Sequence, residues 1–294
     1  MNGAGIWIAG ARPRTLPAAI APVAIGTALA GDQWVPIRAA LALIVALALQ
    51  VGVNYANDYS DGIKGTDHSR VGPVRLVGQG LARPAAVRAA AFASFAVAAI
   101  AGLVLVAASG HWWLIAVGAS AIAAAWLYTG GPRPYGYAGL GEVFVLVYFG
   151  FVPVLGTMYV QTNAVDLAAV IAAAGVGALI TAILVANNLR DIPSDTAAGK
   201  HTLAVRLGDR RTRQLFVVLI LAGLASVPIV AASTSPWALV GLASIPWAVA
   251  PIRVVVRGAI GRDLVSALSG TGVLVAVYAF WLCLGLVVGV IFAS

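Results

Sequence analysis

Nine stretches of this chain are apolar enough to cross a lipid bilayer as helices, which limits the fold more than any other feature. They lie near residues 16–31, 37–57, 85–108, 112–129, 140–160, 166–188, 213–232, 236–256 and 264–292. A spanning helix needs about 17–25 such residues, so the first stretch is the shortest candidate. Only 10% of the residues are charged, against about 25% in soluble domains. The sequence therefore predicts one all-α integral membrane domain over residues 1–294, a bundle of about nine transmembrane helices.

The basic residues fall almost entirely on one side of this predicted bundle. If the N-terminus is cytoplasmic, every one of the 18 Lys and Arg residues except Arg38 lies in a cytoplasmic segment. Such a bias identifies cytoplasmic loops, and tryptophans near the opposite loops agree with an interfacial aromatic belt. These are Trp34, Trp112, Trp113 and Trp237. We therefore expect a multi-pass protein of the cell membrane, with its N-terminus and its long polar loops in the cytoplasm.

The remaining composition excludes several classes of function. The net charge is +8, but the basic residues are spread over separate loops and form no arm or stripe, so we expect no nucleic-acid partner. Cys283 is the only cysteine, which excludes a thiolate metal cluster. His68, His111 and His201 are too scattered for a zinc site.

Two aspartate clusters, at 54–67 and 187–195, follow the second and sixth apolar stretches. Half of the 10 acidic residues of the chain are in them: Asp58, Asp61, Asp67, Asp191 and Asp195. In each cluster an asparagine, Asn54 or Asn187, is followed by one carboxylate at i+4 and another at i+7 or i+8. Both spacings place the three side chains on one helical face, where like charges repel. This arrangement indicates a bound cation.

An all-oxygen set of this kind suits Mg²⁺, which is commonly held by one or two carboxylates together with substrate phosphates. Two such clusters facing each other could hold Mg²⁺ around a diphosphate. Basic residues of the same loops could neutralise the remaining phosphate charge. They are Lys64, Arg133, Lys200 and Arg206. Carboxylates near a helix C-terminus oppose the helix dipole, so a purely structural role as caps is disfavoured.

Several of these residues also have a structural interpretation. Asp67 follows Gly65 and suits a turn. The two asparagines could make interhelical hydrogen bonds, and the basic residues could be ordinary loop residues of a cytoplasmic face. Glu142 is either a paired carboxylate at the membrane edge or a support for the site.

Three classes of protein carry acidic clusters on a helical bundle. One is a Mg²⁺-dependent enzyme that acts on a lipid diphosphate, the second a cation-coupled transporter, and the third a channel with an acidic vestibule. Transporter carboxylates lie near the middle of spans, whereas these lie where spans meet long loops. Coupled transport also gives no reason for basic residues beside the acidic ones, so the residues favour the enzyme.

Four stretches resemble the UbiA-type superfamily of intramembrane prenyltransferases, whose members carry two Asp-rich motifs after their second and sixth spans. They are R-P-R-T-L-P-A-A-I-A-P-V at 12–23, N-D-Y-S-D-G-I-K-G-T-D at 57–67, Y-T-G-G-P-R-P-Y-G-Y-A-G-L-G-E at 128–142 and N-N-L-R-D-I-P-S-D-T-A-A-G-K-H-T-L-A-V-R-L-G at 187–208. The first and third stretches are most similar to the branch of 1,4-dihydroxy-2-naphthoate polyprenyltransferases. Because the first stretch leads into a retained helix in that branch, we interpret 16–31 as a span, not a cleaved signal peptide.

The resemblance implies transfer of a polyprenyl group from polyprenyl diphosphate to 1,4-dihydroxy-2-naphthoate with loss of CO₂, giving demethylmenaquinone. Related folds prenylate other acceptors, so 4-hydroxybenzoate is an alternative. The implied Mg²⁺ ligands are Asn54, Asp58, Asp61, Asp67, Asn187, Asp191 and Asp195, of which Asp58, Asp61, Asp191 and Asp195 would be catalytic. The implied diphosphate-binding residues are Lys64, Tyr128, Arg133, Lys200 and Arg206. Arg12 and Arg14 are candidates for the carboxylate of the acceptor.

Overall fold

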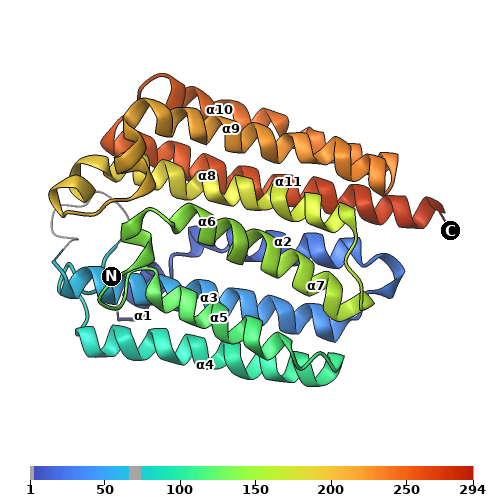
Figure 1. The fold of residues 1–294 in the computed structure, drawn as a ribbon, viewed down its shortest axis with the longest axis horizontal. Coiled ribbons are helices and arrows are strands. Elements are labelled where there is room, and N and C mark those ends of the chain that lie inside the picture. Colours follow the sequence, from blue (N-terminus) through green and yellow to red (C-terminus); the bar gives the residue numbers. More distant parts are fainter. Residues whose placement is uncertain (1–2, 66–73, 294) are drawn as a thin grey trace.

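The computed structural model describes residues 3–65 and 74–293, and within these ranges the chain is helical and has no strand. Most of the helices run along the long axis of the molecule (Figure 1). They are α1 (Gly3–Ala11), α2 (Pro17–Leu29), α3 (Pro36–Ile63), α4 (Pro84–Ser109), α5 (Leu114–Leu127), α6 (Gly141–Val145), α7 (Val152–Thr162), α8 (Leu167–Ala197), α9 (Leu203–Ser233), α10 (Ile245–Val256) and α11 (Leu264–Ala293). Asp67 lies outside the described residues.

Prolines and polar caps fix where most of these helices begin. Pro17, Pro36 and Pro84 occupy the first position of α2, α3 and α4, where the missing N–H has no helical partner to lose. The side chain of Asp166 accepts a hydrogen bond from the Ala169 N–H at 2.8 Å and caps α8. Thr202 caps α9 in the same way. The polar residues between the apolar stretches therefore set the starts of the spans.

Seven helical segments are long and apolar enough to cross a membrane in the described part of the chain. They are α3, α4, the continuous segment Gly141–Thr162, α8, α9, Pro236–Val256 and Gly261–Phe292. The other two predicted spans are the apolar helices α2 and α5, of 13 and 14 residues, which are shorter than the about 17 residues that a span needs. A multi-pass helical membrane protein is thus confirmed, while the count of nine spanning helices is not.

Helix α8 is the most buried of the long helices and forms the centre of the bundle. It packs against α9 and α11 on one side and against the α6–α7 segment on the other (Figure 1). Small residues allow close approach: a Cβ atom on Gly150 would lie 2.8 Å from the Ala173 carbonyl oxygen of α8. Such contacts between small residues are typical of helix packing in membranes.

Both aspartate clusters lie at one end of this bundle. Asp61 is in the last turn of α3 and Asp195 is in the last turn of α8. The C-terminal ends of the two helices lie at the end of the molecule that also holds the N-terminus (Figure 1). The fold therefore brings together two polar segments that are far apart in the sequence.

Candidate active site

A cavity of about 1610 Å³ extends through the bundle between α2, α3, α4, α5, the α6–α7 segment and α8. Most of its wall is apolar. The charged and amide side chains that line it come mainly from the ends of α3 and α8 and from the neighbouring loops, and include Arg12, Arg14, Asn54, Asn57, Asp61, Arg75, Asn187, Asn188, Arg190, Asp195, Lys200 and Arg262. A space with one polar end and a long apolar wall suits a molecule with a charged head and an apolar tail.

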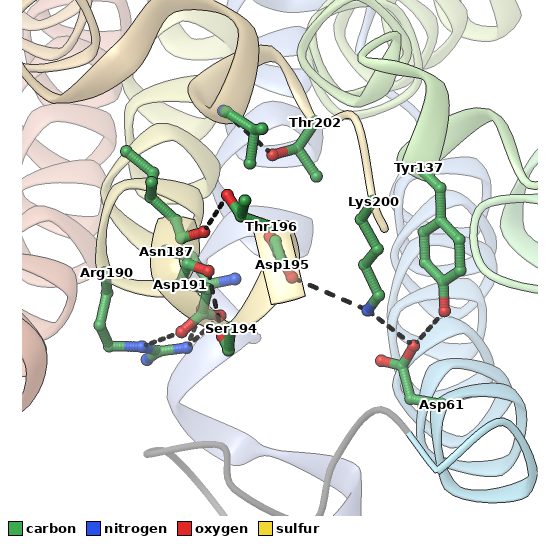
Figure 2. Close-up of polar contacts among 12 residues, drawn as sticks. Asp61, Tyr137, Asn187, Arg190, Asp191, Ser194, Asp195, Thr196, Lys200 and Thr202 are labelled. Atoms are coloured by element: carbon green, nitrogen blue, oxygen red, sulfur yellow. Dashed lines mark hydrogen bonds and ion pairs between the residues drawn. The ribbon is translucent and has the colours of Figure 1, made fainter. Parts of the chain in front are cut away.

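Lys200 connects the two aspartate clusters at the polar end of this cavity. Its Nζ lies 3.4 Å from Oδ1 of Asp61 and 3.9 Å from Oδ1 of Asp195 (Figure 2). All three residues are buried, with exposed fractions of 6%, 2% and 4%. The phenol of Tyr137 donates a hydrogen bond of 2.5 Å to the same Asp61 oxygen. One carboxylate from each predicted cluster thus lies within reach of a single ammonium group.

Two lysines contact the ring of Tyr137. Lys200 Nζ lies 4.3 Å from the ring centroid and Lys64 Nζ lies 5.0 Å from it, so both make cation–π contacts. Lys64 donates hydrogen bonds to the carbonyl oxygens of Thr129 at 2.7 Å and Gly131 at 3.4 Å. Removal from water lowers the pKa of Lys64; the charge of Asp61 opposes this shift, and that of Lys200 adds to it. Positive charge is therefore concentrated around Tyr137.

Asp58 is completely buried and holds the loop that follows the first cluster. Its Oδ2 accepts a hydrogen bond from the Leu76 N–H at 2.8 Å, and its Oδ1 accepts one from the Val77 N–H at 2.9 Å. It is not among the residues that line the cavity. In this structure Asp58 fixes the backbone of the loop beside the site.

Asp191 is likewise engaged within the protein. The guanidinium of Arg190 donates from Nε to Oδ1 at 2.7 Å and from Nη2 to Oδ2 at 2.8 Å (Figure 2). Nη2 of Arg190 also donates to Oδ1 of Asn187 at 2.8 Å. Two-point pairing of this kind is the geometry that guanidinium and carboxylate groups favour. The pair fixes Arg190 and Asn187, which both line the cavity.

Asn54 connects the N-terminal segment to α3. Its Nδ2 donates to the Ala11 carbonyl oxygen at 2.9 Å and to Oγ1 of Thr15 at 3.0 Å. Gln50, one turn earlier, donates to the same hydroxyl at 3.0 Å. These bonds hold the turn at Arg12, whose φ is 53°, at the wall of the cavity.

The other predicted residues divide into two groups. Arg12, Arg14 and Tyr128 line the cavity. Arg133 and Arg206 are exposed and do not line it. The Nε of Arg206 donates to the His201 carbonyl oxygen at 3.1 Å. Of the five predicted diphosphate-binding residues, the structure thus places Tyr128 and Lys200 at the cavity and Lys64 beside Tyr137.

The oxygen donors at the polar end of the cavity suit Mg²⁺. Among the described residues, no three His, Cys, Asp or Glu side chains come together as a metal-binding group. Asp61 and Asp195 instead provide two carboxylates at one point of the wall. Mg²⁺ is typically bound by one or two carboxylates and completed by water and substrate phosphates. The residues present therefore fit a metal that binds together with a diphosphate.

Sequence reasoning missed three parts of this site. Tyr137 lies in the same loop as the predicted Arg133, but nothing in its spacing indicates the bond to Asp61. Thr129 donates from Oγ1 to Oδ1 of Asn57 at 2.8 Å and joins that loop to α3. The pairing of Arg190 with Asp191 has no sequence signal either, because neighbouring residues on a helix do not normally face each other.

These features define a helical integral membrane protein with a large cavity that is polar at one end. The chain belongs to the UbiA prenyltransferase family, whose model matches residues 19–263. It is 55% identical over 276 residues to the 1,4-dihydroxy-2-naphthoate octaprenyltransferase of Mycobacterium tuberculosis, covering 93% of this chain and 94% of that protein. It is 39% identical to the enzyme of the same name from Escherichia coli, with 85% of each chain covered.

Solved structures support the fold. A UbiA homologue from Archaeoglobus fulgidus, bound to GPP and Mg²⁺, matches 96% of this chain and 99% of its own with a TM-score of 0.67 and 14% identity. A UbiA homologue from Aeropyrum pernix matches 94% of this chain and 97% of its own with a TM-score of 0.67 and 16% identity. The helical arrangement is therefore that of this family.

Proposed function

We propose that this protein transfers a polyprenyl group from polyprenyl diphosphate to 1,4-dihydroxy-2-naphthoate, with loss of CO₂. The observation that carries the proposal is the convergence of Asp61, Asp195 and Lys200 at the polar end of a long apolar cavity. The names of relatives that are 55% and 39% identical over most of the chain support the choice of acceptor. The position of the carboxylates at helix ends also disfavours a coupled transporter, whose sites lie near the bilayer midplane.

Asp61 and Asp195 would hold Mg²⁺, assisted by the amide oxygens of neighbouring asparagines. Bound Mg²⁺ would supply charge stabilisation for the departing diphosphate. We propose that Asp58 and Asp191 support the two clusters by holding neighbouring parts of the chain in place. Asp58 fixes the loop at Leu76 and Val77, and Asp191 orients Arg190. We assign this supporting role to Asp58 and Asp191 because both already accept hydrogen bonds within the protein.

Lys200, Lys64 and Tyr128 would bind the diphosphate oxygens. As the C–O bond of the donor breaks, the diphosphate leaves with the electron pair, and ammonium groups already in place stabilise that charge without reorganisation. Arg133 and Arg206 are exposed, so we assign them to the entry of the anionic head from the water side.

The apolar wall would accommodate the polyprenyl chain and keep water from the allylic cation. The electron-rich ring of the acceptor attacks this cation, a C–C bond forms, and the ring carboxylate is lost as CO₂. Arg12 and Arg14, which line the polar end, would orient that carboxylate before it is lost. The cavity thus offers a place for each part of both substrates.

The orientation of the protein in the membrane follows from the distribution of its basic residues. The end of the bundle that carries the site also carries Lys64, Arg133, Lys200 and Arg206, and basic loops face the cytoplasm. We therefore propose that the site opens to the cytoplasm of a cell membrane, where soluble acceptors and Mg²⁺ are available.

The test is product formation by purified protein supplied with Mg²⁺, a polyprenyl diphosphate and either 1,4-dihydroxy-2-naphthoate or 4-hydroxybenzoate, measured by mass spectrometry. A prenylated naphthohydroquinone that has lost CO₂, detected as such or as the quinone formed from it by oxidation in air, is the expected product. Product from hydroxybenzoate alone would keep the chemistry and refute the acceptor. Ion-gradient-driven flux without consumption of the diphosphate would instead support the transporter.

A further inference from the structure

Glu142 is a buried carboxylate that the steps above do not use. It lies in the first turn of α6 and is 7% exposed. Helix α6 packs against α8 (Figure 1). Its Oε1 accepts a hydrogen bond of 3.0 Å from Nδ2 of Asn188. Its Oε2 is buried and receives no hydrogen bond from the residues that the structure describes.

Such a carboxylate is not explained by stability. A buried carboxylate oxygen without a partner is costly, and an apolar side chain of similar size would fill the same space without that cost. A buried polar group that lacks a full set of partners in a folded protein requires an explanation, and a role at the neighbouring site is one. Glu142 itself is not among the residues that line the cavity, but Asn188, the side chain that it holds, does line it.

The bond between Glu142 and Asn188 determines which end of the Asn188 amide is available to a ligand. A carboxylate accepts hydrogen bonds only, so it selects the NH₂ group of Asn188 and excludes the opposite orientation of the amide. Asn188 lines the cavity. Its Oδ1 receives no hydrogen bond from any described residue, in contrast to Oδ1 of Asn187, which accepts from Arg190. An oriented acceptor atom is thus available at the cavity wall.

The depth of Asn188 places this acceptor beyond the diphosphate. Asn188 precedes Asp195 by seven residues of α8, which corresponds to about 10 Å along a helix. Leu184, one turn before Asn188 on α8, and Phe144, on the same short helix as Glu142, line the cavity here. An aromatic ring packed among such side chains and carrying hydroxyl groups would need an acceptor of this kind.

We propose that Glu142 is a positioning residue that orients Asn188, so that Asn188 Oδ1 accepts a hydrogen bond from a ring hydroxyl of the aromatic acceptor. This inference rests on the proposed function. An accepted hydrogen bond places electron density on the ring that attacks the allylic cation, and it fixes the face and rotation of that ring. The pair therefore contributes to acceptor specificity.

The experiment measures binding of three ligands to purified protein by anaerobic calorimetry: 1,4-dihydroxy-2-naphthoate, 1-hydroxy-2-naphthoate and 4-hydroxy-2-naphthoate. Asn188→Ala should weaken binding of the dihydroxy compound about fivefold to tenfold, the effect of one hydrogen bond. The weakening should disappear for one of the two monohydroxy compounds, because that ligand lacks the contacted hydroxyl. A purely structural defect would weaken all three equally, and that outcome would overturn the proposal.

Variants of Glu142 separate positioning from direct catalysis. Glu142→Leu should reproduce the pattern of Asn188→Ala, and the double variant should be no worse than either single variant. Glu142→Gln retains an amide oxygen that can accept from Asn188 and should therefore raise the KM for the acceptor less than threefold. It should lower kcat less than Glu142→Leu does, and it should leave the KM for polyprenyl diphosphate unchanged. A kcat as low in Glu142→Gln as in Glu142→Leu would contradict the positioning role.

Thr196→Ala, an exposed position of α8, is the matched control and should change neither KM. If the wild type binds and prenylates the naphthoate, and the Glu142 and Asn188 variants do so with the same affinity and KM, only this inference is refuted. If the wild type binds prenyl diphosphate but no naphthoate, the acceptor of the proposed function is refuted together with it.

Discussion

Replacing Lys200 by methionine tests the most specific feature of the site. The substitution retains most of the side-chain volume and removes the ammonium group that lies 3.4 Å from Asp61 and 3.9 Å from Asp195. At an effective dielectric constant of about 20, each of these pairs has a Coulomb attraction of about 4–5 kcal/mol, much of which desolvation offsets. Loss of one donor that stabilises developing charge typically lowers kcat by about 10²–10³. We expect a decrease in kcat/KM of this size.

The same substitution should change the response to Mg²⁺. In the wild type, the ammonium group neutralises the two carboxylates that we assign to the metal, so it competes with the metal when no diphosphate is bound. Without it, two buried carboxylates remain close together, and Mg²⁺ should raise the midpoint of thermal unfolding more in Lys200→Met than in the wild type. The stabilisation should be larger in the variant at every Mg²⁺ concentration below saturation.

The assay follows prenyl transfer under saturating acceptor, together with thermal unfolding in detergent across a Mg²⁺ titration. Arg211→Met is the control, since it removes an exposed cation outside the cavity and should change neither quantity. Activity of Lys200→Met within about fivefold of the wild type, which corresponds to about 1 kcal/mol, would refute the diphosphate role. An equal Mg²⁺ response in both proteins would refute the competition between lysine and metal.

Three further predictions concern the surrounding groups. Tyr137→Phe keeps the ring that contacts both lysines but removes the hydrogen bond to Asp61. The value of kcat/KM should fall about tenfold, as expected for one hydrogen bond to a charged group. Steady-state kinetics showing no change would contradict this. Asp191→Asn breaks the buried ion pair with Arg190 and should lower the free energy of unfolding by about 3–5 kcal/mol. The assay is the midpoint of thermal unfolding, with Ser194→Ala as the control. An unchanged midpoint would argue against the structural role of Asp191. Chelation of divalent cations with EDTA should stop turnover, and Mg²⁺ should restore it; activity that persists in EDTA would contradict a metal-dependent reaction.

The spans could be predicted from the sequence because hydropathy and helix formation agree over most of their length. The stretch 85–108 corresponds closely to α4, Pro84–Ser109. The stretch 166–188 corresponds to α8, but this helix continues to Ala197. Its polar last turns stop the hydropathy signal without stopping the backbone hydrogen bonds, so the second cluster lies on a helix that protrudes beyond the apolar part.

The site could be predicted only in part. Rarity and spacing identified the aspartates, and the structure brings Asp61 and Asp195 to the same lysine. Spacing alone also placed Asp58 on the same face as Asp61, yet Asp58 turns to the backbone of Leu76 and Val77. Those partners are N–H groups of a distant loop, which every residue except proline carries, so no side-chain pattern reveals them.

The account depends most on the claim that Asp61 and Asp195, from separate clusters, form one site for a metal–diphosphate complex. The direct measurement is binding of Mn²⁺, as a spectroscopic substitute for Mg²⁺, to the wild type, Asp61→Asn and Asp195→Asn by electron paramagnetic resonance, with and without geranyl diphosphate. The account predicts Mn²⁺ binding that geranyl diphosphate strengthens in the wild type and that either substitution weakens. Binding as strong in both variants as in the wild type would contradict it.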